Sequence, residues 1–181
     1  SSSVTLDFAA TDKNKIPLKM RWLDGGIRPP HPDLIPANDS LGTPDSSNGV
    51  MMIGSKGIIT TGVYGFTPKL YRKGEEVVEF DTSNQTNEYG HHSTWVTACK
   101  AGFNSSEHKA LTSSFDYSGP MTETVLMGNI AIRSYMEKKS GLGNAFPGRK
   151  KLLWDGDAMK ITNYQDANKY VTRDYRKGWE V

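Results

Sequence analysis

The chain has 181 residues, of which 36% are hydrophobic, 10% aromatic and 23% charged, the balance of one soluble globular domain. Its 22 Lys and Arg against 20 Asp and Glu give a net charge of +2, and the basic residues are scattered except for clusters at 148–151 and 173–179, so the sequence carries no electrostatic footprint for nucleic acid. The one cysteine, Cys99, excludes an internal disulfide framework and a cysteine-based zinc site. We expect Cys99 in the core, since free cysteine behaves as a small apolar residue.

Alternating apolar and polar residues predict strands in the first eighty residues. The pattern runs over 4–8 and again over 17–24, and the polar segment between them predicts the turn of an antiparallel pair. The apolar segments 49–54 and 57–65 predict a hairpin, and two further strands are expected within 68–74 and 76–81. The Gly- and Pro-rich segment 24–49 is much longer than the ~4–6 residues of a median connection, which predicts a functional or capping surface loop.

Helices are predicted in the second half of the chain. The segment 91–102 places Trp95, Ala98 and Cys99 on one helical face and ends at Gly102. A long helix is expected over 120–139, then two short apolar segments around 155–156, and finally an amphipathic helix over 164–176.

The long helix is predicted to begin with Gly119-Pro120, because proline is tolerated at the first helical position. Its apolar residues wrap more than one face, so we expect it to be hidden on nearly every side, between two layers or between this chain and another. Asn129, Arg133 and Glu137 interrupt the apolar run well short of the ~20 residues that a membrane span needs.

Strands in one run followed by helices in another predict an α+β fold. We expect a single domain over residues 1–181, built on an open, mainly antiparallel sheet with helices packed on one face. The uncovered face of such a sheet would expose apolar side chains over a large patch, which monomers rarely do, so a homo-oligomer is expected.

No complete catalytic constellation is present in the sequence. The segment 141–148 is the nearest approach to G-x-G-x-x-G, but Phe146 stands where the third glycine belongs and a helix precedes it, so no cofactor-binding residue is expected. Adjacent His91 and His92 are predicted to point to different faces and not to chelate one metal, even with Glu88 nearby. We therefore expect neither catalytic nor metal-binding residues.

Four segments nevertheless resemble a known protein family: 18–36, 49–71, 113–134 and 150–181. They contain, in order, W-x-D-G-G, F-D-Y-x-G-P-x-T-E, L-x-G-N-x-A-x-R and Y-R-x-G-W. In this combination they are similar to the C-terminal domain of the Gfo/Idh/MocA oxidoreductases, in the branch common in Bacteroidetes.

The resemblance implies a parent protein whose N-terminal Rossmann domain binds NAD or NADP, while the C-terminal domain forms part of the sugar pocket and the oligomer interface. The family's catalytic motifs, Glu-Lys-Pro and Asp-x-x-x-His, do not occur here. The chain also begins without a signal peptide. Its first residues resemble a β-strand from the interior of a longer protein. We therefore expect it to begin downstream of both motifs and to bind no dinucleotide alone. The compartment, cytoplasm or periplasm, is left open.

Five residues are candidates for the wall of a sugar pocket. Trp22 is suited to stacking on a sugar face, and Asp24, Arg28, His91 and His92 offer polar contacts. Each also has a structural explanation: Trp22 alternates with core positions, and Asp24 begins a Gly-Gly turn.

Two candidate functions for the chain are consistent with these residues and with the resemblance. The first is the substrate and assembly domain of a NAD(P)-dependent sugar oxidoreductase, or of a related NAD-using glycosidase. The second is a stand-alone carbohydrate-binding or scaffold module without catalysis.

Overall fold

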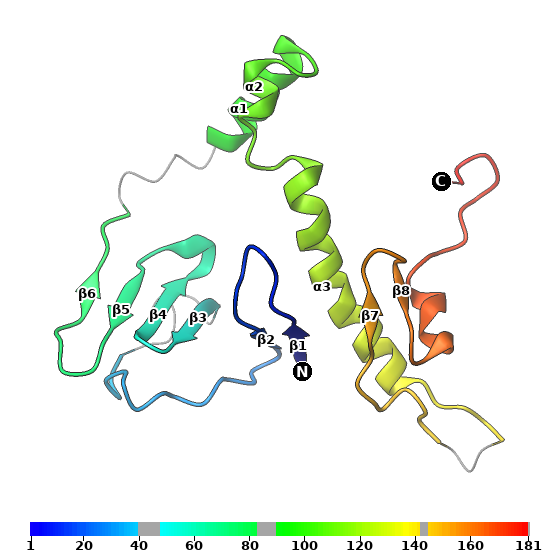
Figure 1. Ribbon diagram of the computed structural model, residues 1–181, viewed down its shortest axis with the longest axis horizontal. Helices are drawn as coiled ribbons and strands as arrows, with labels where there is room; N and C mark the ends of the chain where they lie inside the picture. Colours follow the sequence, from blue (N-terminus) through cyan, green and yellow to red (C-terminus); the bar gives the residue numbers. More distant parts are fainter. Residues whose placement is uncertain (40–47, 83–89, 142–144, 181) are drawn as a thin grey trace. The chain divides into compact units, whose positions relative to one another are not determined.

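The computed structural model describes residues 1–39, 48–82, 90–141 and 145–180. Where the sequence predicted one domain, contacts divide the chain into two compact units (Figure 1). Unit 1 comprises Ser1–Arg28 together with Thr112–Val181, and unit 2 comprises Pro29–Leu111. The two units are described separately.

Unit 1 begins with the predicted antiparallel pair, β1 (Ser3–Phe8) and β2 (Leu18–Leu23). Val4 lies opposite Trp22, so the alternating pattern places cross-strand partners on the same face. The long helix α3 follows at Phe115–Met136. The remaining elements of unit 1 are β7 (Trp154–Asp155), β8 (Lys160–Ile161) and the 3-10 helix η2 (Gln165–Tyr170).

Unit 2 contains a four-stranded antiparallel sheet in the order β3-β4-β5-β6. Its strands are β3 (Gly49–Gly54), β4 (Gly57–Gly62), β5 (Lys69–Tyr71) and β6 (Val78–Glu79), with the 3-10 turn η1 (Val63–Gly65) after β4. Two helices complete it: α1 (Gly90–Ala101), which ends before Gly102 as predicted, and α2 (Ser106–Lys109), which packs against α1.

These elements confirm the α+β class with open antiparallel sheets. The described strands are divided among three sheets, β1-β2, β3-β4-β5-β6 and β7-β8. Loop residues Ile35 and Leu34 pack with Ile58 and Tyr71 on one face of the largest sheet. This loop belongs to the segment predicted to cap the fold, and here it contributes side chains to the core.

The other face of the largest sheet carries a row of apolar side chains, one from each strand. Met52 pairs with Ile59, Ile59 with Leu70 and Leu70 with Val78. Leu70 is half-buried and the other three are exposed. The expectation of an uncovered apolar face therefore holds within the described residues.

The predicted start of the long helix was wrong. Helix α3 begins five residues before Pro120, because the carbonyl of Ser114 accepts hydrogen bonds from the N–H groups of Tyr117 (3.0 Å) and Ser118 (2.8 Å) and nucleates the first turn there. At the sixth helical position Pro120 removes only one backbone hydrogen bond. The helix ends at Met136 because Glu137 turns into an extended conformation with ψ 118°.

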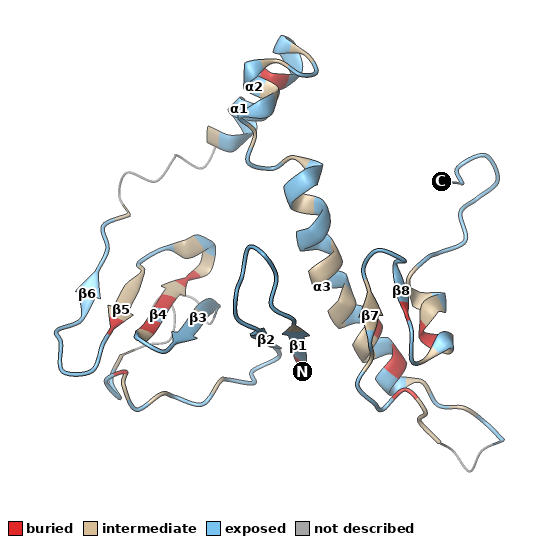
Figure 2. Cartoon of the chain, in the orientation of Figure 1, coloured by how far each residue is buried: buried red, intermediate tan, exposed pale blue. Residues whose placement is uncertain are grey.

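The predicted burial of this helix on nearly every side was also wrong. Ile130 and Ser134 are its only buried residues, and Met121, Val125 and Leu126 are exposed (Figure 2). The elements of unit 1 that contact the helix, which include β1, β7 and η2, are short and leave much of its surface exposed. Ile130 lies in a cluster with Ile161 and Ala167.

Two smaller predictions were also wrong. Cys99 is exposed, since only Ala98 of helix α1 is buried where α2 packs against it. The amphipathic helix expected over 164–176 is replaced by η2, which ends at Tyr170. The side chain of Asn168 donates to the carbonyl of Ile161 (3.0 Å) and accepts from its N–H (2.7 Å), so this short helix is fastened to β8.

Candidate functional site

The candidate sugar-wall residues of unit 1 lie at the end of β2 and in the turn that follows. Asp24 begins this turn, and Gly25 and Gly26 continue it with positive φ values of 63° and 89°. A side chain at Gly25 would also collide with Ser1, since its Cβ would lie 2.4 Å from the Ser1 Cα. The backbone conformation of this turn therefore explains both glycines of the W-x-D-G-G motif.

Two hydrogen bonds fix the Asp24 carboxylate. The Ser2 N–H donates to Oδ1 at 2.7 Å, and the Ser2 hydroxyl donates to Oδ2 at 2.8 Å. The hydroxyl and then the N–H lower the pKa of Asp24, and the Trp22 side chain acts in the same direction. Asp24 is therefore a charged acceptor at neutral pH, with lone pairs left for a ligand.

Trp22 is 58% exposed, although it alternates with residues expected in the core. Its cross-strand partner is Val4, which is buried, so the two members of this pair differ in exposure. Arg28 is exposed four residues after Asp24. Unit 1 thus presents an aromatic ring, an oriented carboxylate and a guanidinium within seven residues of sequence.

His91 and His92 lie in the first turn of helix α1, in unit 2. Their ring centroids are 4.2 Å apart and their Nε2 atoms are 3.4 Å apart. The prediction that they point to different faces was wrong: both side chains are exposed, and their side-chain torsions bring the rings together although the Cα–Cβ bonds diverge. Glu88, the third residue considered, lies outside the described residues.

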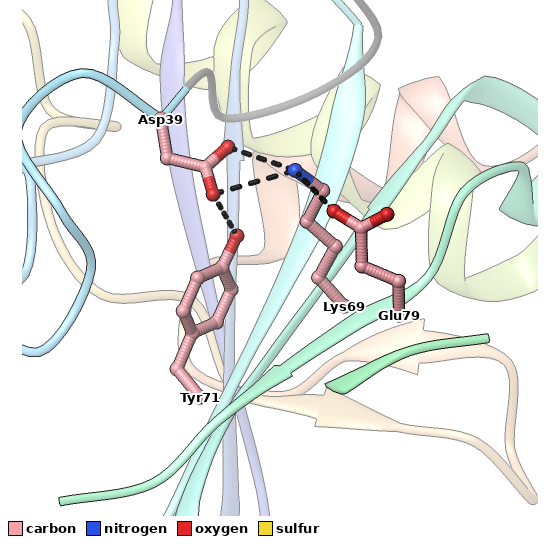
Figure 3. Close-up of polar contacts among 4 residues, drawn as sticks. All are labelled: Asp39, Lys69, Tyr71 and Glu79. Atoms are coloured by element: carbon pink, nitrogen blue, oxygen red, sulfur yellow. Dashed lines mark hydrogen bonds and ion pairs between the residues drawn. The ribbon is translucent and has the colours of Figure 1, made fainter. Parts of the chain in front are cut away.

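A polar cluster that the sequence analysis missed lies on the covered side of the largest sheet (Figure 3). The Tyr71 hydroxyl donates to Oδ2 of Asp39 at 2.8 Å, and Lys69 Nζ lies 3.2 Å from Oδ1 of Asp39 and 3.1 Å from Oε1 of Glu79. Lys69 and Tyr71 are two residues apart on one strand, which places them on one face; this period-2 relation was the available signal.

This cluster fastens the loop before residue 40 to the sheet. The hydrogen bond with Glu79, and then that with Asp39, raises the pKa of Lys69, while burial raises the pKa of Tyr71. Tyr71 is only 2% exposed, and its hydroxyl proton is already donated to Asp39. The geometry is therefore that of a structural clip between the loop and the sheet.

Of the glycines at 141–148, Gly141 and Gly148 lie in the described part of the chain. The segment follows helix α3, and a Cβ on Gly148 would lie 2.1 Å from the carbonyl oxygen of Ser134. Gly148 thus serves the close packing of its loop against α3. In the described ranges no three residues among His, Cys, Asp and Glu are grouped so as to hold a metal ion.

Comparison with profiles of known protein families finds no match to this chain, and comparison with curated proteins finds none either. Across the described residues, every helix is too short or too polar to cross a membrane.

Proposed function

We propose that this chain is the substrate and assembly domain of a NAD(P)-dependent sugar oxidoreductase or of a related NAD-using glycosidase. The ordered motifs that resemble the C-terminal domain of the Gfo/Idh/MocA family support the proposal, as does the α+β architecture with antiparallel sheets. The observation that carries it is the exposed indole of Trp22 beside the fixed carboxylate of Asp24.

The chemistry of these two groups suits a sugar. An exposed aromatic face can cover the C–H groups of a pyranose ring, while an oriented carboxylate accepts hydrogen bonds from hydroxyls. Because Ser2 already holds both oxygens of Asp24, the carboxylate needs little ordering when a ligand binds. In this proposal Trp22 and Asp24 bind and orient the substrate, Arg28 contacts its polar groups, and the nucleotide domain of the parent protein supplies the nicotinamide and the base.

The assembly role rests on the uncovered face of the four-stranded sheet. The row Met52, Ile59, Leu70 and Val78 crosses all four strands and is mostly exposed. Pairing of this face with a second copy would remove apolar surface from water, and a two-fold axis would make each face its own complement. A homo-oligomer through the sheet is thus part of the proposal.

Calorimetric titration with a panel of neutral, amino and acidic monosaccharides tests the sugar site. We expect one class to bind, and we expect both Trp22→Ala and Asp24→Asn to weaken that binding at least tenfold, about 1.4 kcal/mol. Trp179→Ala is the matched control, because Trp179 is also exposed in unit 1. Unchanged affinity in both site variants would contradict the proposal.

Turnover separates the two candidate functions. If the parent protein, with its nucleotide domain, oxidises or cleaves the sugar that the chain binds, the enzyme function holds. If the chain binds sugar and the parent protein turns none over with NAD or NADP, the stand-alone carbohydrate-binding or scaffold module is the better description.

A further inference from the structure

Strand β3 forms one edge of the four-stranded sheet in unit 2 (Figure 1). Among the described residues, β4 is the only strand that pairs with it. Its sequence, Gly-Val-Met-Met-Ile-Gly, contains no charged residue and no proline, and Val50, Met52 and Ile53 are each more than half exposed. Natural proteins usually protect such an edge, because its unpaired backbone groups can bind a strand of another chain.

The opposite edge of the same sheet is protected. Strand β6 is two residues long, and its Glu79 carries a charge that pairs with Lys69 at 3.1 Å. Glu75 and Glu76 precede this strand and are exposed. Short strands and charged side chains are common protections against edge-to-edge association. Strand β3 has six residues and no charge, so the two edges differ in their capacity to accept a further strand.

The register of the β3–β4 hairpin shows which backbone groups of β3 are available. Gly54 pairs with Gly57 across a two-residue loop, and pairs that exchange hydrogen bonds alternate with pairs that do not. Every second residue of β3, counted back from Gly54, therefore bonds to β4. The N–H and C=O groups of Gly49, Met51 and Ile53 point outward, away from β4.

We propose that β3 pairs antiparallel with β3 of a second copy of this chain, about a two-fold axis at Met51. In this register Met51 lies opposite Met51 of the second copy, and Gly49 of each copy lies opposite Ile53 of the other. Every outward N–H and C=O group of the two strands then has a partner, because these three residues carry the outward groups on both strands. The edge of β3 is thus its own complement, as a two-fold contact requires.

The side chains also fit this register. Val50 lies beside Met52 of the second copy, on the face that carries the exposed apolar row, so the rows of the two copies become continuous. On the other face, Gly49 leaves space for the exposed Ile53 of the second copy. No like charges meet, since β3 has none. Because β6 is protected, pairing of this sheet through β3 stops at a dimer.

This contact does not depend on the proposed function. It uses backbone groups at the edge of the sheet, whereas the assembly role proposed above uses side chains on the uncovered face. It also uses no part of unit 1, to which Trp22 and Asp24 belong. The two contacts can therefore be tested separately.

Sedimentation equilibrium of the whole 181-residue chain tests the association. We expect a dimer with a Kd on the order of 10 μM. Ile53→Pro should weaken it at least tenfold, because proline removes an outward N–H group and its ring obstructs the second strand, while the bonds to β4 remain. Ile53→Thr is the matched control: it keeps the N–H group and the β-branched shape, so it should remain a dimer. Circular dichroism checks that each variant is folded.

Ile59→Asp distinguishes the edge from the face of the sheet. Ile59 belongs to the apolar row on β4 and lies away from the edge, so this variant should keep the edge dimer. Association that is lost in Ile59→Asp and kept in Ile53→Pro would assign the contact to the face and overturn the proposal. An unaltered chain that is monomeric at hundreds of micromolar, on the order of ten times the expected Kd, would overturn it too.

Cross-linking tests the register without the proline variant. In a Cys99→Ser chain, Met51→Cys places two thiols across the axis, where the Cα atoms of a hydrogen-bonded pair lie about 5.5 Å apart, within disulfide range. Ile53→Cys places the two thiols four residues apart along the paired strands, with Cα atoms roughly 14 Å apart. We expect mild oxidation to yield a covalent dimer of the first variant only. Equal cross-linking of both variants, or none in Met51→Cys, would overturn the proposed pairing.

Discussion

The indole N–H of Trp154 donates a 2.5 Å hydrogen bond to Oε1 of Glu123, joining strand β7 to helix α3. Gly156 leaves room for this bond, since a Cβ there would lie 3.3 Å from the same Glu123 oxygen. Both partners are half-buried. The bond therefore connects elements thirty-one residues apart in a partly dry environment.

Trp154→Phe removes the donor and keeps most of the ring. We expect the free energy of unfolding to fall by about 1–2 kcal/mol, because the Glu123 carboxylate is left half-buried without this partner. Urea denaturation measures the change. In a double-mutant cycle with Glu123→Ala, a coupling below ~0.3 kcal/mol would show that the bond contributes nothing.

Gly148→Ala should destabilise unit 1. The added Cβ would lie 2.1 Å from the Ser134 carbonyl oxygen, so the loop or helix α3 must move. We expect a loss of about 1–3 kcal/mol in the free energy of unfolding, as for overpacked sites. Gly128→Ala is the control: it lies within α3, where an added Cβ would meet Val4 Cγ1 at 3.9 Å, an ordinary contact, so it should stabilise by up to ~1 kcal/mol. Equal effects would contradict the packing explanation.

Tyr71→Phe should cost about 1 kcal/mol at pH 7, through loss of the hydrogen bond to Asp39. Burial raises the pKa of Tyr71 above its ordinary 10.0. A raised pKa contributes stability that is complete below the unfolded value and is lost as pH rises through the folded value. The difference between the unaltered chain and the variant should therefore narrow above pH 10, as denaturation at pH 7, 10 and 11 would measure. A constant difference would count against this explanation.

The sheet face should determine the association state. Met52→Asp places a charge in the exposed apolar row, so we expect it to dissociate a homo-oligomer that light scattering detects at tens of micromolar. Met159→Asp is the control, because Met159 is equally exposed in unit 1 and lies outside the row. An unaltered chain that is monomeric at this concentration would refute the sheet interface.

The chain alone should not bind dinucleotide. The segment most similar to the dinucleotide-binding motif G-x-G-x-x-G follows a helix and not a strand. Its last glycine, Gly148, packs closely against Ser134. Calorimetric titration with NAD and NADP should show no saturable binding tighter than ~1 mM, about 4 kcal/mol. Binding that appears only when the nucleotide domain of the parent protein is added would support the proposed function.

The sequence correctly predicted the elements whose positions are determined by residues close to them in the chain. The hairpin β3–β4 follows from two apolar segments around a two-residue turn, and α1 ends where Gly102 adopts a φ of 94°. The start of α3 was missed because Ser114 competes with Pro120 for that role, and a proline at the sixth position is tolerated when the first turn is already formed. Helix boundaries depend on such competitions between neighbouring residues.

Long-range contacts were beyond a single sequence. Nothing in the pattern of residues joins Asp39 to Tyr71 across thirty-two positions, although Lys69 and Tyr71 could have been placed on one face. The approach of His91 and His92 depends on side-chain torsions, which backbone periodicity does not specify. Of the candidate sugar residues, Asp24 was chosen for its place in a Gly-Gly turn, and its anchoring by Ser2 emerged only from the structure.

The exposure of Cys99 affects how this protein behaves on storage. The chain has no second cysteine, so an oxidised thiol on α1 can form a disulfide only with another molecule. In air, such cross-linking would yield a covalent dimer joined through helix α1, which has the mass of a dimer joined through the sheet. A reducing agent, or replacement of Cys99 by serine, distinguishes the two species and leaves the sheet face intact.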